Sequence, residues 1–397
     1  MTPTTTGPLD LQALRNDTPG CATTYLNNGA AGLMPLPVQQ AVQAHLAREA
    51  NLGAYRAAEE VHERLLAGYG RAAELIGAQA DEIAFVESGS RAWQLALEAI
   101  ELKPGDVILT TPSIWGGNYA ALVGHARRHG AHIRCVPCHA DGSLNPDLLR
   151  EMIDQRVRLI ELCWAPSGNG VLHPAAKVGA IARNAGIPYL IDASQALGQV
   201  PLDVRELGCD LLAASGRKWL RAPRGTGLLY ANRGFLENHR PVMVDYFSAP
   251  IIEGCLQPRR DARRFENAEH SVAVRLGLCA ALDYTHQCGV PRLQARIRHL
   301  AQTLRHALEE MGPDVRVHDH GLELTGIVTF TLAGHATREV HAHLRRHSIE
   351  TALNLPGYMP LAPQAQAVGE VIRVTPHAYN DEQDLARLLE ALIRLDD

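Results

Sequence analysis

The sequence contains very little lysine. Of its 38 lysines plus arginines, only Lys103, Lys177 and Lys218 are lysines, in a chain of 397 residues. A reaction that needs a lysine amine, such as the formation of an imine with an aldehyde, therefore has three possible positions in this chain.

Long apolar runs and a surplus of positive charge are also missing. No stretch approaches the roughly 20 apolar residues of a membrane-spanning helix, and the N-terminal segment lacks the basic and apolar regions of a secretory signal. The net charge of −5 argues against nucleic acid as the main partner, because such binding rests on a basic surface. Eight scattered cysteines do not resemble a disulfide scaffold. We therefore expect a cytoplasmic protein with reduced thiols.

Several well-known binding motifs are absent as well. The sequence has no Walker A motif, no complete GxGxxG and no HExxH, so it gives weak support to nucleotide binding and none to a zinc protease. Cys135 and Cys138 have the spacing of half a zinc site, but no second pair accompanies them. We interpret this pair as structural and expect no metal.

Short apolar runs alternate with helical patterns over the first two thirds of the chain. Because the runs are apolar throughout, they indicate strands buried on both faces, and the helices between them indicate βαβ units. The pattern predicts a large, mostly parallel seven-stranded sheet of the α/β class, with strands at 83–86, 107–110, 132–136, 158–165, 188–192, 210–215 and 227–231.

The pattern changes after about residue 250. Long amphipathic stretches at 271–286 and 291–311 precede two short apolar runs and two more helices, which predicts a smaller α+β domain. We therefore divide the chain into an N-terminal segment (1–22), a large domain (23–255) and a small C-terminal domain (256–397).

Lys218 and Asp192 follow two of the predicted strands. In a doubly wound sheet the loops beyond the strand ends form the ligand crevice, so Lys218 is a candidate nucleophile, although its local sequence taken by itself favours a surface lysine on a loop. A carboxylate at the end of a buried strand needs a cationic or hydrogen-bonding partner. Asp192 could hold the protonated nitrogen of a pyridine ring, with Gln195 near the ring oxygen, or it could simply cap the next helix.

Three further features could contribute to the same crevice. The turn Ser88-Gly89-Ser90-Arg91 lies between a strand and a helix, where free backbone N–H groups can hold a phosphate. Trp115 also follows a strand and could stack on a flat ring, although most tryptophans belong to the core. Arg373 interrupts an apolar strand, where a substrate carboxylate or an internal acid would pair with it.

Taken in order, these residues resemble the fold-type I pyridoxal-phosphate (PLP) enzymes of the class V aminotransferase family. The resemblance runs from TTYLNNGAAGLMPLPV (23–38) to RVTPHAYNDEQDL (373–385), and its most specific stretch is residues 192–230. It implies a PLP cofactor, an amino-acid substrate, and a homodimer with active sites at its interface. It implies neither a nucleic acid nor a membrane partner.

The resemblance also implies a role for each residue. Lys218 would bind the cofactor as a Schiff base and move protons, Asp192 would contact the pyridine nitrogen, and Trp115 would cover the ring where desulfurases place a histidine. The remaining cofactor contacts would come from Ser88, Gly89, Ser90, Arg91, Ser167, Gln195, Ser215, Arg217 and, from the partner chain, Ser271. Substrate would be bound by Asn28, Asn169 and Arg373.

One departure from the family guided our prediction of the reaction. Cysteine desulfurases carry a nucleophilic cysteine shortly before the strand of Arg373, and residues 350–373 contain none. We therefore expect that the chain is not a persulfide-forming desulfurase. The motifs GRKW (216–219) and IRVTPH (372–377) resemble ergothioneine-pathway sulfoxide lyases and lincosamide-pathway enzymes.

The resemblance of these two motifs predicts a carbon–sulfur lyase in small-molecule or secondary metabolism. Such an enzyme removes the Cα proton of a cysteine S-conjugate and expels its β-sulfur group. The alternatives are a decarboxylating or oxidative deaminase, an aminotransferase or an amino-acid epimerase, which would use the same residues. A non-catalytic protein on this scaffold and a nucleotide-dependent α/β enzyme are the alternatives from other classes.

Overall fold

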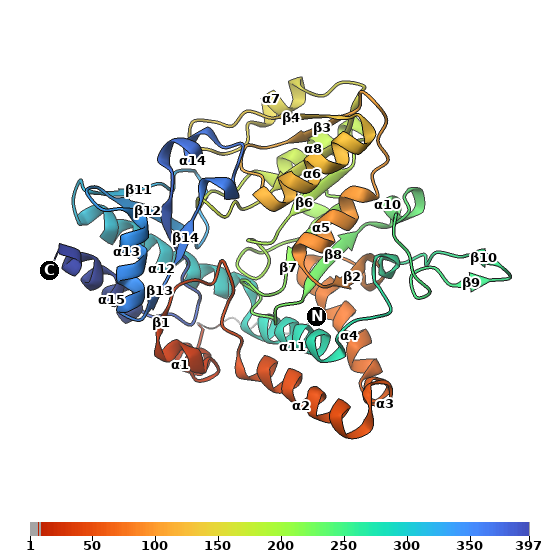
Figure 1. Cartoon of the computed structure of the whole chain (residues 1–397), viewed down its shortest axis with the longest axis horizontal. Helices are drawn as coiled ribbons and strands as arrows, with labels where there is room; N and C mark the ends of the chain where they lie inside the picture. Colours follow the sequence, from red (N-terminus) through yellow and green to blue (C-terminus); the bar gives the residue numbers. More distant parts are fainter. Residues whose placement is uncertain (1–6, 8, 397) are drawn as a thin grey trace.

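A computed structural model describes residue 7 and residues 9–396 of the chain. A large mixed sheet with helices on both faces occupies one side of Figure 1, and a smaller four-stranded sheet with its own helices lies beside it. This arrangement confirms the predicted α/β class with a large sheet and a smaller C-terminal α+β part.

The large sheet contains the seven predicted strands. Their spatial order is β2 (Ile83–Val86), β8 (Gly227–Ala231), β7 (Leu211–Ser215), β6 (Tyr189–Asp192), β5 (Val157–Cys163), β3 (Val107–Thr110) and β4 (His132–Cys135). Strands β3 to β7 are parallel to one another, whereas β8 runs antiparallel to both of its neighbours, β2 and β7. The carboxyl ends of β5, β6 and β7 consequently lie side by side, as a site at one edge requires.

Most of the strands are apolar because both faces of the sheet are covered, whereas the edge strand β4 (HIRC) is exposed or only half-buried. Leu109 and Ile160 face one core with Val178 of α8 (Ala175–Ala185), whereas Ile108 and Leu190 face the other core, beneath the helices on the opposite side. These opposite helices are α5 (Gly89–Glu98), α6 (Gly116–His129) and α10 (Arg233–Asn238); short helices α7 (Pro146–Glu151) and α9 (Val204–Leu207) complete this part.

The N-terminal helices pack with a helix from much later in the chain. Helix α11 (Val272–Cys288) lies against α2 (Leu36–Leu52) and α4 (His62–Ile76), and its Leu278 and Ala281 join the core of the large sheet. Helices α1 (Leu11–Asn16) and α3 (Ala54–Glu60) complete this layer. Amphipathic spacing predicted α11 but not its packing partner, and the predicted domain boundaries stay predictions.

The smaller sheet is antiparallel and has the order β11 (Val315–Val317), β12 (Val328–Leu332), β15 (Val371–Val374) and β14 (Ala352–Asn354). Its helices are α12 (Val290–Glu310), α13 (Thr337–Arg346), α14 (Pro363–Val368) and α15 (Glu382–Ile393). The early strand β1 (Thr24–Tyr25) pairs with β13 (Ile349–Glu350). The chain therefore passes between the two sheets before it enters the large one.

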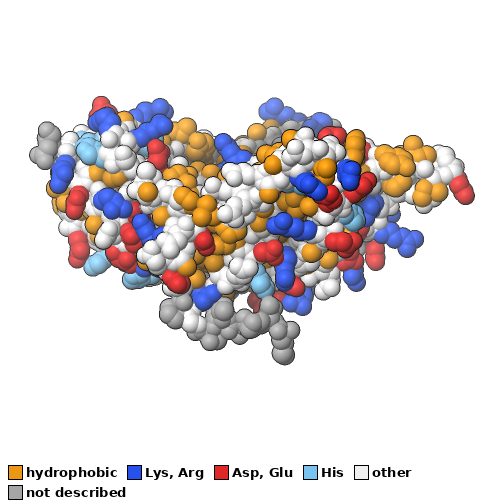
Figure 2. Space-filling model, turned by 90° about the horizontal axis from the view of Figure 1, so that it is seen from below, with side chains coloured by type: hydrophobic (Ala, Val, Ile, Leu, Met, Phe, Trp, Pro, Cys, Tyr) orange, Lys and Arg blue, Asp and Glu red, His pale blue; other side chains and the backbone are white. Residues whose placement is uncertain are grey.

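A hairpin projects from the irregular segment between the sheets. It is formed by β9 (Ile251–Ile252) and β10 (Cys255–Leu256), and it extends away from the rest of the chain in Figure 1. The same end of the molecule carries apolar side chains on its surface in Figure 2, and Ile251 and Leu256 are 61% and 59% exposed.

The structure offers no support for a membrane span or a metal site within the part of the chain that it describes. None of the described helices is both long and apolar enough to cross a membrane, and no group of three or more potential metal ligands occurs among the same residues. Burial raises the pKa of the Cys135 thiol to about 11 and that of Cys138 to about 12. Both are free cysteines.

Glu161 gives the fold a testable pH dependence. This residue lies in the middle of β5, where its Oε2 accepts a hydrogen bond of 2.5 Å from Thr110 and its Oε1 has no partner. Burial raises the pKa of the carboxyl group from 4.5 to about 8. The folded protein therefore keeps a proton that the unfolded chain has released, so this group lowers stability as the pH rises between these two values.

We expect Glu161→Gln to stabilise the protein far more at pH 8 than at pH 5, by a difference on the order of 3 kcal/mol. Glutamine keeps an acceptor for Thr110 and cannot ionise. Denaturant unfolding at both pH values, with the cofactor state held constant, measures the difference. An equal effect at the two pH values would show that Glu161 is not protonated in the folded protein.

Candidate active site

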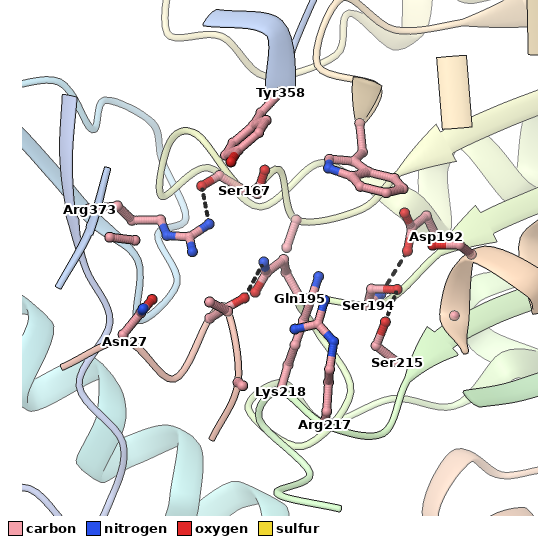
Figure 3. Close-up of a pocket in the computed structure, with 18 of the residues that line it drawn as sticks. Asn27, Ser167, Asp192, Ser194, Gln195, Ser215, Arg217, Lys218, Tyr358 and Arg373 are labelled. Atoms are coloured by element: carbon pink, nitrogen blue, oxygen red, sulfur yellow. Dashed lines mark hydrogen bonds between the residues drawn. The ribbon is translucent and has the colours of Figure 1, made fainter. Parts of the chain in front are cut away.

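A cavity of about 430 Å³ lies at the carboxyl ends of β5, β6 and β7. Figure 3 shows the side chains that point into it, from the large sheet on one side and from Arg373 and Tyr358 of the smaller part on the other. Asn27 and its neighbours reach the cavity from the segment after β1. Its volume lies in the range usual for small-molecule and cofactor sites.

Lys218 lies on the tight turn that follows β7. The backbone N–H of Arg221 closes this turn on the carbonyl of Lys218 at 3.0 Å, and Arg221 has a φ of 62°, which is unusual for a residue other than glycine. Burial lowers the pKa of the Lys218 amine to about 8, against the opposing effect of Asp192. A neutral amine is thus accessible near neutral pH, as a nucleophile or base requires.

Asp192 ends β6 and is buried, and two groups orient its carboxylate. Its Oδ2 accepts a hydrogen bond of 2.8 Å from Asn118 of α6, and its Oδ1 accepts one of 2.9 Å from the backbone N–H of Ser194. Both donors are neutral. The carboxylate therefore keeps its charge available for a cation inside the cavity.

The part of the cavity wall at the N-terminus of α5 is suited to an anion. The N-terminus of α5 reaches the cavity through Gly89 and Ser90, next to Ser215, Arg217 and Arg224. A side chain at Gly89 would collide with Ser215, because its Cβ would lie 2.5 Å from the Ser215 Oγ. Free N–H groups at a helix N-terminus together with two guanidinium groups form a site for a phosphate.

Arg373 brings a buried cation to the other end of the cavity. It lies on β15, is 5% exposed, and its Nη1 donates to the carbonyl of Ser167 at 3.2 Å, as drawn in Figure 3. Its Nε has no partner, and burial lowers the pKa of its guanidinium to about 10. An unpaired buried cation is costly. A carboxylate bound in the cavity would supply the missing partner.

Gln195 and Trp115 also line the cavity. The amide of Gln195 is already used twice by the protein: its Nε2 donates to the Gly29 carbonyl at 2.9 Å, and its Oε1 accepts from Trp219 at 2.8 Å. Trp115 precedes α6, and its ring covers Gly117, where a Cβ would lie 2.1 Å from the indole. The roles predicted for both residues at a cofactor ring remain predictions.

The predicted site residues separate into two groups. The cavity is lined by Gly89, Ser90, Trp115, Ser167, Asp192, Gln195, Ser215, Arg217, Lys218 and Arg373. Five others lie elsewhere: Ser88, Arg91, Asn28, Asn169 and Ser271. Ser88 caps α5 and Ser271 caps α11, whereas the Arg91 side chain contacts the sulfur of Met243.

Asn28 and Asn169 were predicted to bind substrate, yet neither lines this cavity. Asn28 is buried and donates to the carbonyl of Thr375 at 2.8 Å while accepting from Tyr379 at 2.6 Å. Its neighbour Asn27 faces the cavity instead. A shift by one residue cannot be read from a loop sequence, because no periodicity fixes which side chain points inward.

Sequence reasoning also missed several residues that line the cavity. Asn118, Ser194, Arg224 and Tyr358 all contribute to its wall. The proximity of Arg224 to the strand of Gly227 and its place in the run RKWLRAPRG were the available signals for a second cation. Asn118 lies three residues after Trp115, and only the packing of α6 brings it to Asp192.

These residues fit PLP. Lys218 can bind its aldehyde, the carboxylate of Asp192 can pair with its ring nitrogen, and the α5 N-terminus with Arg217 and Arg224 can hold its phosphate. The unpartnered Nε of Arg373 leaves a separate place for a carboxylate. The cavity therefore has room and chemistry for the cofactor and an amino acid together.

Comparison with known proteins supports the family resemblance found in the sequence. The model of the aminotransferase class-V family matches residues 24–388. The cysteine desulfurase of Cronobacter sakazakii is 28% identical, over 97% of this chain and 98% of its own. The structure of a cysteine desulfurase from Escherichia coli has a TM-score of 0.90 and 22% identity, covering 98% and 99% of the two chains.

A third comparison includes the cofactor. A mutant of C-DES with glycine covalently linked to its PLP cofactor has a TM-score of 0.87 and 24% identity, covering 96% of this chain and 99% of its own. The expected PLP cofactor is confirmed by the family match together with this neighbour.

The predicted reaction is wrong. We had expected a lyase for cysteine S-conjugates and had excluded a persulfide-forming desulfurase, but relatives that match almost the whole chain are named cysteine desulfurases. The exclusion rested on the lack of a cysteine in residues 350–373. That lack shows only that this segment supplies no thiol, and it does not limit where a sulfur acceptor comes from.

Proposed function

The chain belongs to the aminotransferase class-V family of PLP enzymes, and we propose from this premise that it removes the sulfur atom from cysteine. The observation that carries the proposal is that the Lys218 amine and the Arg373 guanidinium, whose Nε has no partner, line one cavity. The names of the full-length relatives supply the substrate class.

Different side chains bind the substrate and transfer its proton. Arg373 binds the α-carboxylate of the amino acid, and the backbone carbonyl of Ser167 fixes the guanidinium in place. The Nζ of Lys218 removes the proton from Cα once the amine is neutral. Bound PLP would supply an electron sink, and Asp192 would hold its protonated ring nitrogen.

Sulfur removal requires an acceptor. In the balanced reaction, cysteine and a thiol R–SH give alanine and a persulfide R–S–SH: the Cβ–S bond breaks, an S–S bond forms, and a proton is delivered to Cβ. Cys163 is the one cysteine among the described residues that line the cavity, and burial raises the pKa of its thiol well above the usual range. A buried protonated thiol is a poor acceptor, so the proposal assigns this role to a thiol that enters the cavity.

Product analysis tests the proposed reaction. The protein, loaded with PLP and supplied with L-cysteine and dithiothreitol, is expected to release alanine and sulfide in equal amounts. Release of pyruvate and ammonia in place of alanine would contradict it, because those products arise when the Cβ–S bond breaks by elimination.

Replacing Arg373 tests the carboxylate site. We expect Arg373→Leu to raise the KM for cysteine by about 10- to 100-fold, the loss of one charge-assisted pair. Arg373→Lys should recover part of this effect, because lysine keeps the charge without the forked geometry. Steady-state kinetics of the three proteins decide the matter, and a KM for the leucine variant within about twofold of wild type would place the carboxylate elsewhere.

We also propose that the chain forms a homodimer, as the family resemblance implied. The segment between the two sheets exposes Val242, Tyr246 and Ile251, which are 69%, 77% and 61% exposed. Exposed apolar residues in such a number favour an interface. Sedimentation is expected to give twice the chain mass, and Ile251→Glu should weaken the dimer; a monomeric wild type would contradict the proposal.

The sequence resemblance to ergothioneine-pathway and lincosamide-pathway enzymes concerns two motifs only. Removal of sulfur from cysteine requires neither of these pathways, nor a role in secondary metabolism.

A further inference from the structure

A second cavity, of about 270 Å³, lies beside the candidate active site. Among the described residues, none lines both cavities. The second cavity is bounded by the loop 140–142, by Gly168 and Asn169, by residues at and after β11, and by the segment from β14 through η4 (Pro356–Tyr358) to α14. Asn169, which the family resemblance placed at the substrate, is the one predicted site residue that lines it.

One wall of this second cavity is basic. Arg316, His318 and His320 all line it, whereas the intervening Val317 and Asp319 are buried and do not. Burial, with added effects of Arg316 and His320, lowers the pKa of His318 to about 4. Asp141, the acidic residue in the lining, keeps its negative charge, because the hydrogen bonds that it accepts from the backbone N–H and hydroxyl of Ser143 lower its pKa. Arg316 is the one arginine or lysine among the described lining residues, so an anionic group in this cavity would bind there.

The facing wall combines an apolar surface with one unsatisfied amide. Its apolar members are Leu355, Pro356, Met359, Ala362, Ala365, Val368 and Val371. Asn354 lies among them, is 4% exposed, and its side-chain oxygen has no hydrogen-bond partner. A buried polar atom without a partner is costly. A hydrogen-bond donor on a bound molecule would remove that cost.

A thin wall separates the two cavities. It contains Gly168, where a Cβ would lie 2.3 Å from the Cε of Met359 and 2.9 Å from the Nδ2 of Asn354. Ser167 directly precedes Gly168 in the sequence, and Tyr358 directly precedes Met359; both Ser167 and Tyr358 face the candidate active site (Figure 3). A molecule that contacts Met359 and Asn354 thus acts on the backbone that carries Ser167 and Tyr358.

We propose that the second cavity is a binding site for a small molecule with a carboxylate, an apolar body and a hydrogen-bond donor. The carboxylate lies at Arg316 and His320, the apolar body packs on Met359 and Ala365, and the donor pairs with Asn354. Occupancy fixes Met359 and, through it, the position of Tyr358 at the substrate cavity. This last step rests on the proposed function, whereas binding does not.

The binding experiment uses 4-hydroxybenzoate as the probe and calorimetry on the PLP-loaded protein. We expect saturable binding below about 10 mM, at least about fivefold weaker binding of the neutral 4-hydroxybenzamide, and a similar loss in Arg316→Gln. Ala365→Phe fills the cavity and should abolish binding. Ala367→Phe, on the same helix but outside the cavity, is the matched control and should bind normally.

Two results would overturn the site. One is the absence of wild-type binding at about 10 mM. The other is binding that survives in Ala365→Phe but is lost in Arg373→Leu, which would place the carboxylate in the substrate cavity. The probe should also change the KM for cysteine by about twofold or more in wild type and not in Ala365→Phe. An unchanged KM despite binding would overturn the coupling, and a protein without activity on cysteine would contradict the proposed function alone.

Discussion

Replacing Lys218 with alanine is expected to lower turnover by about 10³-fold or more, because the same amine attaches the cofactor and moves the proton. The amine lines the cavity, and desolvation there lowers its pKa to about 8, so that a neutral form is available near neutral pH. Covalent incorporation of PLP into the cofactor-free wild type should accordingly become faster as the pH rises through about 8. The alanine variant should show no such incorporation.

The chain offers a close control for this experiment. Lys177 is an exposed lysine on α8, and Lys177→Ala should keep wild-type turnover and cofactor content. Thermal unfolding of both variants checks that the fold is kept. Turnover of Lys218→Ala within about tenfold of wild type would show that the amine is not the catalytic base.

Replacing Asp192 with asparagine should have the second-largest effect, a loss of about 10²- to 10³-fold in kcat. The carboxylate receives hydrogen bonds from Asn118 and from the backbone of Ser194. An asparagine can still accept from the Ser194 N–H, and its NH2 group can donate to Asn118 once the Asn118 amide turns its oxygen toward it. What the substitution removes is the negative charge that keeps a proton on the cofactor's ring nitrogen. The KM for cysteine should change little, because Asp192 does not contact the substrate carboxylate in this account.

Asn118→Ala separates charge from orientation. This variant keeps the carboxylate and loses one hydrogen bond of 2.8 Å, so we expect a decrease in kcat of about tenfold, the value of one buried hydrogen bond. If Asp192→Asn and Asn118→Ala instead lowered kcat equally, Asp192 would act as a structural acceptor and its charge would have no role in the reaction.

Much of the fold was predictable because burial leaves a simple pattern. Most of the seven strands of the large sheet are apolar on both faces, so they appeared as continuous runs, and β6 and β7 ended where Asp192 and the Lys218 turn begin. The packing of α11 on α2 and α4 could not be predicted in the same way. Its amphipathic pattern shows that one face is buried, and it does not show what covers that face.

The site was predictable where a residue was unusual for its surroundings. Lys218 is one of three lysines, and Arg373 is an arginine within an apolar strand. Asn118, Arg224 and Tyr358 carry no such signal, since only the folded chain brings them to the cavity. The reaction was predicted wrongly for a related reason: the absence of a cysteine from one segment was taken as a property of the whole site.

The central claim is that this cavity binds PLP through Lys218. It is tested most directly by borohydride reduction of the PLP-loaded protein, followed by peptide mass mapping. The account predicts one pyridoxyl group, on the peptide that contains Lys218, and an unmodified Lys103 and Lys177. A pyridoxyl group on either of those two lysines, or a protein that remains unmodified and colourless with added PLP, would contradict it.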